Sequence, residues 1–91
     1  GAVEAALLEH PEVLEVSVYG VPDARLGEEV GATIYARSAL DPDELRAFLA
    51  PRLARFEIPR YVHFASEPLP RNASGKILKR ELRDEAAARW G

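Results

Sequence analysis

The spacing of apolar residues changes early in the chain, and each spacing predicts a different kind of element. Residues 3–10 repeat apolar positions at helical intervals, so we expect an amphipathic helix that Pro11 ends. Residues 13–21 then alternate apolar and polar side chains, as a strand does when one of its faces is buried. The apolar face of this predicted strand consists of Leu14, Val16 and Val18.

Two further segments predict strands. Residues 29–36 alternate like residues 13–21, and residues 22–27 between them contain proline and glycine, which suit a loop. We therefore expect these two strands to form an antiparallel pair. Residues 61–64 are rich in residues that favour strands, and they predict a third one.

The middle of the chain predicts a helix with a defined start and end. Asp41 suits the N-cap, Pro42 the first helical position and Glu44 the third. Apolar residues follow at helical spacing, but Pro51 removes a backbone donor, so this helix should kink or end near Leu49.

The last third of the chain predicts a loop and a closing helix. Prolines, an asparagine and a glycine at residues 68–75 indicate a loop, and helical spacing returns from Ile77 onward. The order helix, strand, strand, helix, strand, loop, helix is typical of an α+β protein. We expect a small three-stranded sheet with helices packed against it.

Composition excludes several classes of protein. A chain of 91 residues is expected to form a single domain, residues 1–91. It has no cysteine, which excludes disulfides and thiolate metal sites and is compatible with the cytoplasm, where we expect the protein. Its apolar runs are far shorter than the roughly 18 residues of a membrane span. A net charge of −3 argues against nucleic acid as a partner.

The segment from Pro68 to Leu82 has the clearest chemical character. Two prolines stiffen its approach, Gly75 permits backbone conformations closed to other residues, and Lys76 follows. A lysine held there can project out of the domain, and its ammonium suits a carboxylate or a phosphoryl oxygen. Taken without its surroundings, Lys76 would instead be interpreted as a solvated lysine at a helix start. A P-loop is excluded because that motif needs serine or threonine where Ile77 stands.

Other polar residues are expected to have structural roles. His63 should lie on a strand surface and His10 at a helix end. Asp23 and Glu28 are interpreted as turn residues rather than as a metal pair, and we expect no metal site. Lys79 and Arg80 are interpreted as solvated charges, with a phosphate clamp as the alternative.

The string Pro70-Arg71-Asn72-Ala73-Ser74-Gly75-Lys76-Ile77-Leu78-Lys79-Arg80-Glu81-Leu82 resembles the last signature motif of the acyl-adenylate-forming (AMP-binding) superfamily. That superfamily contains acyl-CoA synthetases, peptide-synthetase adenylation domains and firefly luciferase. Residues 3–11, 20–28 and 56–60 also match the family in order and spacing. The chain thus resembles the C-terminal domain of these enzymes from about Val3 to Arg83, and most of all that of a fatty-acyl-CoA synthetase.

The resemblance implies a two-step reaction. ATP and a carboxylate form an acyl-adenylate with Mg²⁺, and the CoA thiol then displaces AMP. Lys76 matches the lysine that bridges carboxylate and nucleotide in the first step, and Pro70, Ser74 and Gly75 match its supporting loop. A rotation of the domain then presents a second face to CoA. The residues implied near CoA are Arg25, Leu26, Gly27, Phe56 and Arg60.

Two features depart from the complete family pattern. Glu57 stands where relatives commonly carry lysine, and an acid beside a polyphosphate is unfavourable. The family's hinge and ATP-binding loop belong to a large N-terminal adenylation domain that this chain does not contain. We therefore expect no adenylation by residues 1–91 alone, and the acyl substrate cannot be predicted from them. Two alternatives stay open: an adenylation domain that feeds a carrier protein, and a protein-interaction module without a catalytic role.

Overall fold

The computed structural model describes residues 1–25 and 27–90. Its elements confirm the predicted order and the α+β class. They are α1 (Ala2–Leu8), β1 (Val13–Asp23), β2 (Gly27–Ala36), α2 (Pro42–Leu49), the short 3-10 helix η1 (Arg55–Glu57), β3 (Tyr61–Phe64) and α3 (Lys79–Trp90).

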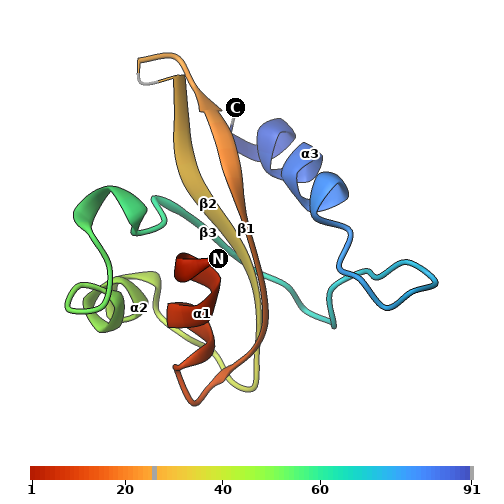
Figure 1. Ribbon diagram of the computed structural model, residues 1–91, viewed down its shortest axis with the longest axis horizontal. Coiled ribbons are helices and arrows are strands. Elements are labelled where there is room, and N and C mark those ends of the chain that lie inside the picture. Colours follow the sequence, from red (N-terminus) through yellow and green to blue (C-terminus); the bar gives the residue numbers. More distant parts are fainter. Residues whose placement is uncertain (26, 91) are drawn as a thin grey trace.

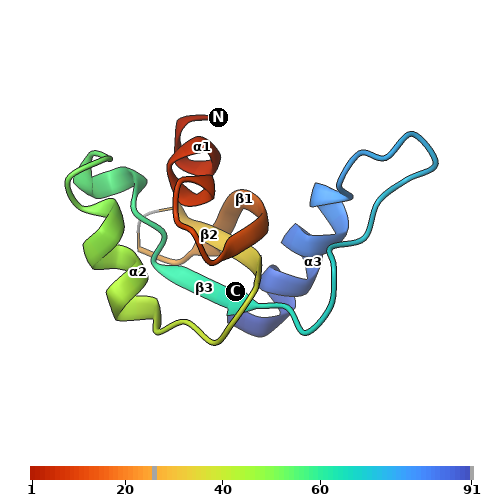
Figure 2. The ribbon, with the colours of Figure 1, turned by 90° about the horizontal axis from the view of Figure 1, so that it is seen from below.

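The strands form one sheet in the order β1-β2-β3. β1 and β2 are antiparallel, as predicted, whereas β2 and β3 are parallel. Parallel neighbours need a crossover connection, which α2 and η1 supply here. Helices α1 and α2 lie on one face of the sheet and α3 lies on the other (Figures 1 and 2).

Because helices cover both faces, the domain has two apolar clusters. The larger one joins the sheet to α1 and α2, and its buried members are Ala6, Leu7, Val13, Val16, Ala32, Ile34, Leu45 and Leu49. The smaller one joins the sheet to α3, and its buried members are Tyr19, Val21, Leu69, Leu82 and Ala86. Within the described residues, none of the helices is both long and apolar enough to cross a membrane.

The expected apolar face of β1 is wrong in part. The pairing of β1 with β2 shifts register between Val13 and Glu15, so Leu14 is an extra residue in a bulge and is 39% exposed. After the bulge, Ser17 and Tyr19 lie on the face that α3 covers, and both are buried. The Tyr19 hydroxyl hydrogen-bonds Thr33 Oγ1 at 2.5 Å, which satisfies its polar end.

The loop expected at residues 22–27 is shorter than predicted. The β1–β2 ladder continues to the pair Asp23 and Gly27, so Pro22 belongs to β1. Asp23 Oδ1 accepts a hydrogen bond from the Arg25 N–H at 2.9 Å, as expected of a turn former. Gly27 has a φ of +84°, a left-handed value that favours glycine where the second strand begins.

Helix boundaries follow local chemistry. The Asp41 side chain accepts the Asp43 N–H at 2.9 Å, Pro42 is the first helical residue, and α2 ends at Leu49, all as predicted. The closing helix begins at Lys79 rather than at Ile77, because Ile77 is held in a bridge with Arg71.

Candidate functional site

A narrow double-stranded loop, residues 70–78, projects from the domain between β3 and α3 (Figures 1 and 2). We call it the lysine arm. Its base is closed by an antiparallel bridge between Arg71 and Ile77 and by a hydrogen bond from the Leu78 N–H to the Pro70 carbonyl at 2.9 Å. The predicted loop is therefore an ordered structure.

Asn72 fixes the shape of the arm's tip. Its side-chain oxygen accepts the backbone N–H groups of Ser74 at 2.9 Å and Lys76 at 3.0 Å. Its backbone N–H donates to the Lys76 carbonyl at 2.9 Å, and its carbonyl accepts the Gly75 N–H at 2.9 Å. Gly75 has a φ of +84°, which the tight turn requires. Ser74 and Gly75 thus belong to the same turn as Lys76, and Pro70 lies at the base of the arm.

The Lys76 side chain is exposed and its ammonium has no hydrogen bond or ion pair with any described residue. It adjoins a surface hollow of about 450 Å³ at the junction of the arm and α3. Thus the backbone N–H and carbonyl of Lys76 are both hydrogen-bonded to Asn72, while the ammonium is available to a group outside the domain. The residues lining the hollow are Asn72, Lys76, Ile77, Leu78, Lys79, Arg80, Glu81 and Asp84.

The neighbouring cations differ from Lys76. Lys79 Nζ lies 3.2 Å from Glu4 Oε2, and Glu4 also accepts the Val18 N–H at 3.1 Å. Glu4 therefore joins α1, the outer edge of β1 and the start of α3. Arg80 is exposed beside the hollow. Lys79 and Arg80 were both expected to be solvated charges. Arg80 has no ion pair with the described residues, whereas Lys79 is paired with Glu4.

The link between the arm and the sheet was not found from the sequence. Glu15 on β1 accepts the Leu69 N–H at 2.9 Å, and the same oxygen lies 3.7 Å from Arg71 Nη2. Arg71 in turn donates from Nη1 to the Gly75 carbonyl at 2.7 Å. No local signal marks Glu15, because its partners are 54 or more positions away.

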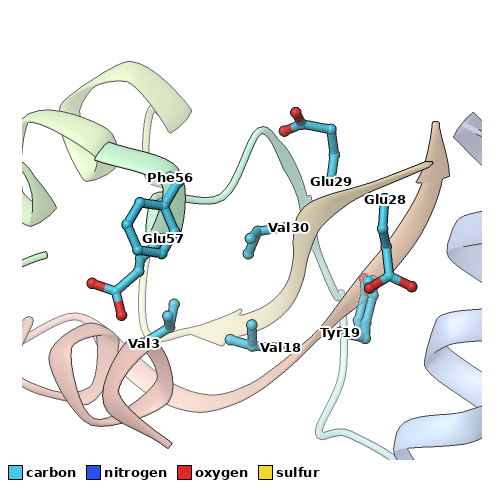
Figure 3. Close-up of a pocket in the computed structure, with 9 residues that line it drawn as sticks. Val3, Val18, Tyr19, Glu28, Glu29, Val30, Phe56 and Glu57 are labelled. Carbon is cyan, nitrogen blue, oxygen red and sulfur yellow. The ribbon is translucent and has the colours of Figure 1, made fainter. Parts of the chain in front are cut away.

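The residues expected near CoA lie away from the arm. Phe56 on η1 is 83% exposed, and it borders a hollow of about 300 Å³ with an apolar floor that includes Val3, Val18 and Val30 (Figure 3). Glu57 lies on the η1 side of this hollow, and Glu28 and Glu29 lie on the β2 side (Figure 3).

Arg25, Gly27 and Arg60 do not line that hollow. Arg25 and Gly27 are exposed at the β1–β2 turn, and Leu26 lies outside the described residues. Arg60 is exposed, with its guanidinium 5.6 Å from the Tyr61 ring centre. The backbone carbonyl of Arg60 accepts a hydrogen bond from Arg46 Nη2 at 2.6 Å, so Arg46 holds the chain between η1 and β3. The sequence analysis did not identify this role of Arg46.

The remaining titratable residues form no metal site in the described chain. No three histidine, aspartate or glutamate side chains come together there in a way that could hold an ion. His63 lies on β3 and is half-buried; its burial and the nearby Arg89 lower the pKa of its imidazole. His10 accepts the Glu12 N–H through Nδ1 at 3.0 Å and packs edge-on against Phe48.

The described residues thus form a small α+β domain whose projecting arm carries an exposed lysine that is unpaired among them. Comparison with known families identifies it: residues 2–76 match the AMP-binding enzyme C-terminal domain. The chain belongs to this family, and its relatives are ligases of the acyl-CoA synthetase type.

Three proteins similar to the chain illustrate the family. The chain is 45% identical over 91 residues to fatty acid–[acyl-carrier-protein] ligase ScoC of Streptomyces coeruleorubidus, covering 98% of the chain and 17% of the relative. It is 45% identical over 83 residues to 2-succinylbenzoate–CoA ligase of Geobacillus kaustophilus, covering 89% and 17%. The structure of a Mycobacterium tuberculosis fatty acyl CoA synthetase matches with a TM-score of 0.88 and 37% identity, covering 97% and 18%. The chain therefore spans less than a fifth of the length of each.

Proposed function

We propose that this chain is the mobile C-terminal domain of an ATP-dependent acyl-CoA synthetase, and that Lys76 is the lysine of its adenylation step. The family membership supports the class of enzyme. The role of Lys76 is supported by one observation above all: the ammonium is exposed and unpaired among the described residues, whereas the backbone beneath it is fixed by Asn72.

Adenylation brings a carboxylate against the α-phosphate of ATP, so two negative groups must approach each other. A cation held at that point lowers the repulsion, and it does so most where charge develops during transfer. Lys76 fits this task because no carboxylate of the described residues forms an ion pair with its ammonium. An ordered backbone also reduces the entropy lost when the lysine meets its substrate.

The rest of the nucleotide site belongs in this proposal to an N-terminal adenylation domain. The described residues offer no cluster of carboxylates for Mg²⁺. Residues 1–91 alone should therefore bind ATP weakly and form no acyl-adenylate. The carboxylate is assigned only as a class, because relatives of equal identity are named for a fatty acid and for 2-succinylbenzoate.

CoA is the proposed acceptor, and the fit of this chain to CoA is mixed. The exposed ring of Phe56 suits stacking on a base, and Arg60 and Arg25 can each meet a phosphate. The carboxylates of Glu28, Glu29 and Glu57 beside Phe56 oppose a polyphosphate. A carrier protein is the second candidate acceptor, supported by the 45% identity to a ligase named for the acyl carrier protein.

The test uses the full-length enzyme that contains this chain and separates the two half-reactions. Lys76→Ala should lower the rate of adenylation, followed by carboxylate-dependent pyrophosphate exchange, by about 10² to 10³, by analogy with the loss of one oxyanion donor. Thioester formation from supplied acyl-adenylate should change far less. CoA and a phosphopantetheinylated carrier protein are compared as acceptors in the second assay.

Arg80→Ala is the matched control, because it removes a neighbouring exposed cation and leaves the arm intact. An equal loss in both variants would mean that general positive charge, rather than Lys76, matters. Equal loss of both half-reactions in Lys76→Ala would also overturn the proposal. Turnover by residues 1–91 alone would remove the need for an adenylation domain.

A further inference from the structure

The lysine arm needs a fixed direction as well as a fixed shape. All of the polar contacts that Asn72 makes lie within the arm, so they set the geometry of its tip and not its orientation to the sheet. Ile77 adds an apolar contact to the cluster under α3. In the part of the chain that the structure describes, the side-chain polar contacts from sheet to arm come from Glu15.

One guanidinium connects Glu15 to the residue before Lys76. Arg71 faces the Glu15 carboxylate through Nη2 at 3.7 Å and donates to the Gly75 carbonyl through Nη1 at 2.7 Å. The planar fork of arginine keeps these two directions at a fixed angle, which a lysine cannot do. Movement of the Glu15 carboxylate would therefore change the position of Gly75 and the lysine that follows it.

The bulge in β1 explains why Glu15 faces the arm. Without an extra residue at Leu14, Val13 and Glu15 would lie on the same face of the strand. With it, Val13 is buried with α1 and α2, while Glu15 lies on the other face and accepts the Leu69 N–H. The bulge thus combines core packing with an anchor for the arm.

We propose that Glu15 and Arg71 are positioning residues that aim Lys76 through the Glu15–Arg71–Gly75 contacts; this rests on the proposed role of Lys76 in adenylation. In this proposal neither residue contacts the substrates. A displacement of about 1 Å can cost up to about 100-fold in rate when reacting groups must be aligned. Loss of either residue therefore lowers the rate of adenylation without removing a binding contact.

The test measures adenylation and thioester formation separately in the full-length enzyme. Glu15→Gln keeps an acceptor for the Leu69 N–H but removes the charge opposite Arg71, and Arg71→Lys keeps the charge but removes the fork. Each should lower kcat of adenylation about tenfold with near-unchanged KM for ATP and carboxylate. Thioester formation from supplied acyl-adenylate should stay at the wild-type rate.

A double variant separates positioning from simple loss of stability. In a Lys76→Ala background, Glu15→Gln should cause no further loss, because no lysine remains to be aimed. Glu9→Ala is the matched control. It removes a carboxylate that lies 3.4 Å from the Arg52 guanidinium, and this ion pair lies outside the arm.

The outcomes distinguish this inference from the proposed function. If Lys76→Ala leaves adenylation intact, the proposed function fails. If Lys76→Ala abolishes adenylation but Glu15→Gln and Arg71→Lys match wild type, or their losses add to that of Lys76→Ala, only the positioning role fails. A loss in Glu9→Ala as large as in Glu15→Gln would also overturn the positioning role.

Discussion

Gly75 offers a test of whether the conformation of the arm's tip matters to Lys76. Its φ of +84° lies in the left-handed region, where a side chain is strained, and apart from the adjacent residues no atom lies within 4 Å of an added Cβ. Gly75→Ala therefore adds backbone strain without a steric clash. Gly27 is a matched site, because it has the same φ and equally open surroundings.

The expected loss of folding stability follows from the left-handed φ and the open surroundings of the two glycines. The left-handed conformation costs an L-residue about 1–2 kcal/mol, and the reduced freedom of the unfolded chain returns about 0.4–1 kcal/mol. We expect Gly27→Ala to lower the free energy of unfolding by about 1 kcal/mol, or roughly 4–8 °C in Tm for a domain of this size. Gly75→Ala should cost no more than that, because the projecting arm can relax locally.

Urea and thermal unfolding of residues 1–91 measure the stability of both variants, and pyrophosphate exchange by the full-length enzyme measures adenylation by Gly75→Ala. We expect adenylation to fall about tenfold, because the tip releases its strain by moving Lys76. Gly75→Asn should retain more activity, since asparagine tolerates the left-handed region better than alanine. Wild-type adenylation in Gly75→Ala, together with the expected stability loss in Gly27→Ala, would refute the reasoning.

Two further predictions concern stability. The buried Ser17 hydroxyl has no hydrogen-bond partner among the described residues, so Ser17→Ala should raise the free energy of unfolding by about 1 kcal/mol, and a lower urea midpoint would contradict this. Burial alone would raise the pKa of Glu4, but hydrogen bonds from Gly1, Val18 and Lys79 together lower it below its ordinary value of 4.5. Because the folded-state pKa is the lower one, this stabilisation is present above the unfolded pKa and is lost as pH falls through the folded pKa. Urea unfolding of residues 1–91 from about pH 6 to about pH 3 should show a steeper loss in wild type than in Glu4→Gln, and parallel curves would contradict the assignment.

Elements defined by local chemistry could be predicted from the sequence. Asp41 and Pro42 specify the start of α2 through contacts within one turn, and Pro51 prevents its continuation. The three strands were located for the same reason, since each consists of a short run of residues that favour extended backbone.

Features that depend on distant contacts could not be predicted. Alternation along β1 was interpreted as one buried and one exposed face, but α3 covers the second face, so Ser17 and Tyr19 are buried as well. The parallel pairing of β2 with β3 depends on how α2 crosses the sheet, which no single segment encodes.

The candidate site divides in the same way. The position of Lys76 in a loop after Gly75 could be predicted because the motif is continuous in sequence. The anchor at Glu15 could not, because it depends on a one-residue bulge in β1 and on a partner more than half the chain away. That the Lys76 ammonium is unpaired among the described residues could not be predicted either, since the nearby Lys79 is paired with Glu4.

The geometry of the domain also constrains how its two candidate surfaces can work. The lysine arm and η1, with Phe56, lie at opposite ends of the domain's longest dimension, which is 35 Å (Figures 1 and 2). Both helical layers are packed on one sheet, so the two surfaces cannot approach each other without unfolding. A single reaction centre can therefore meet Lys76 or Phe56, but not both at once.

If both residues are used, the whole domain must turn between the two half-reactions. A covalent crosslink that holds the arm against the adenylation domain should then permit adenylation and block thioester formation. Thioester formation at the full rate in the crosslinked enzyme would mean that the surface around Phe56 has no part in the second step.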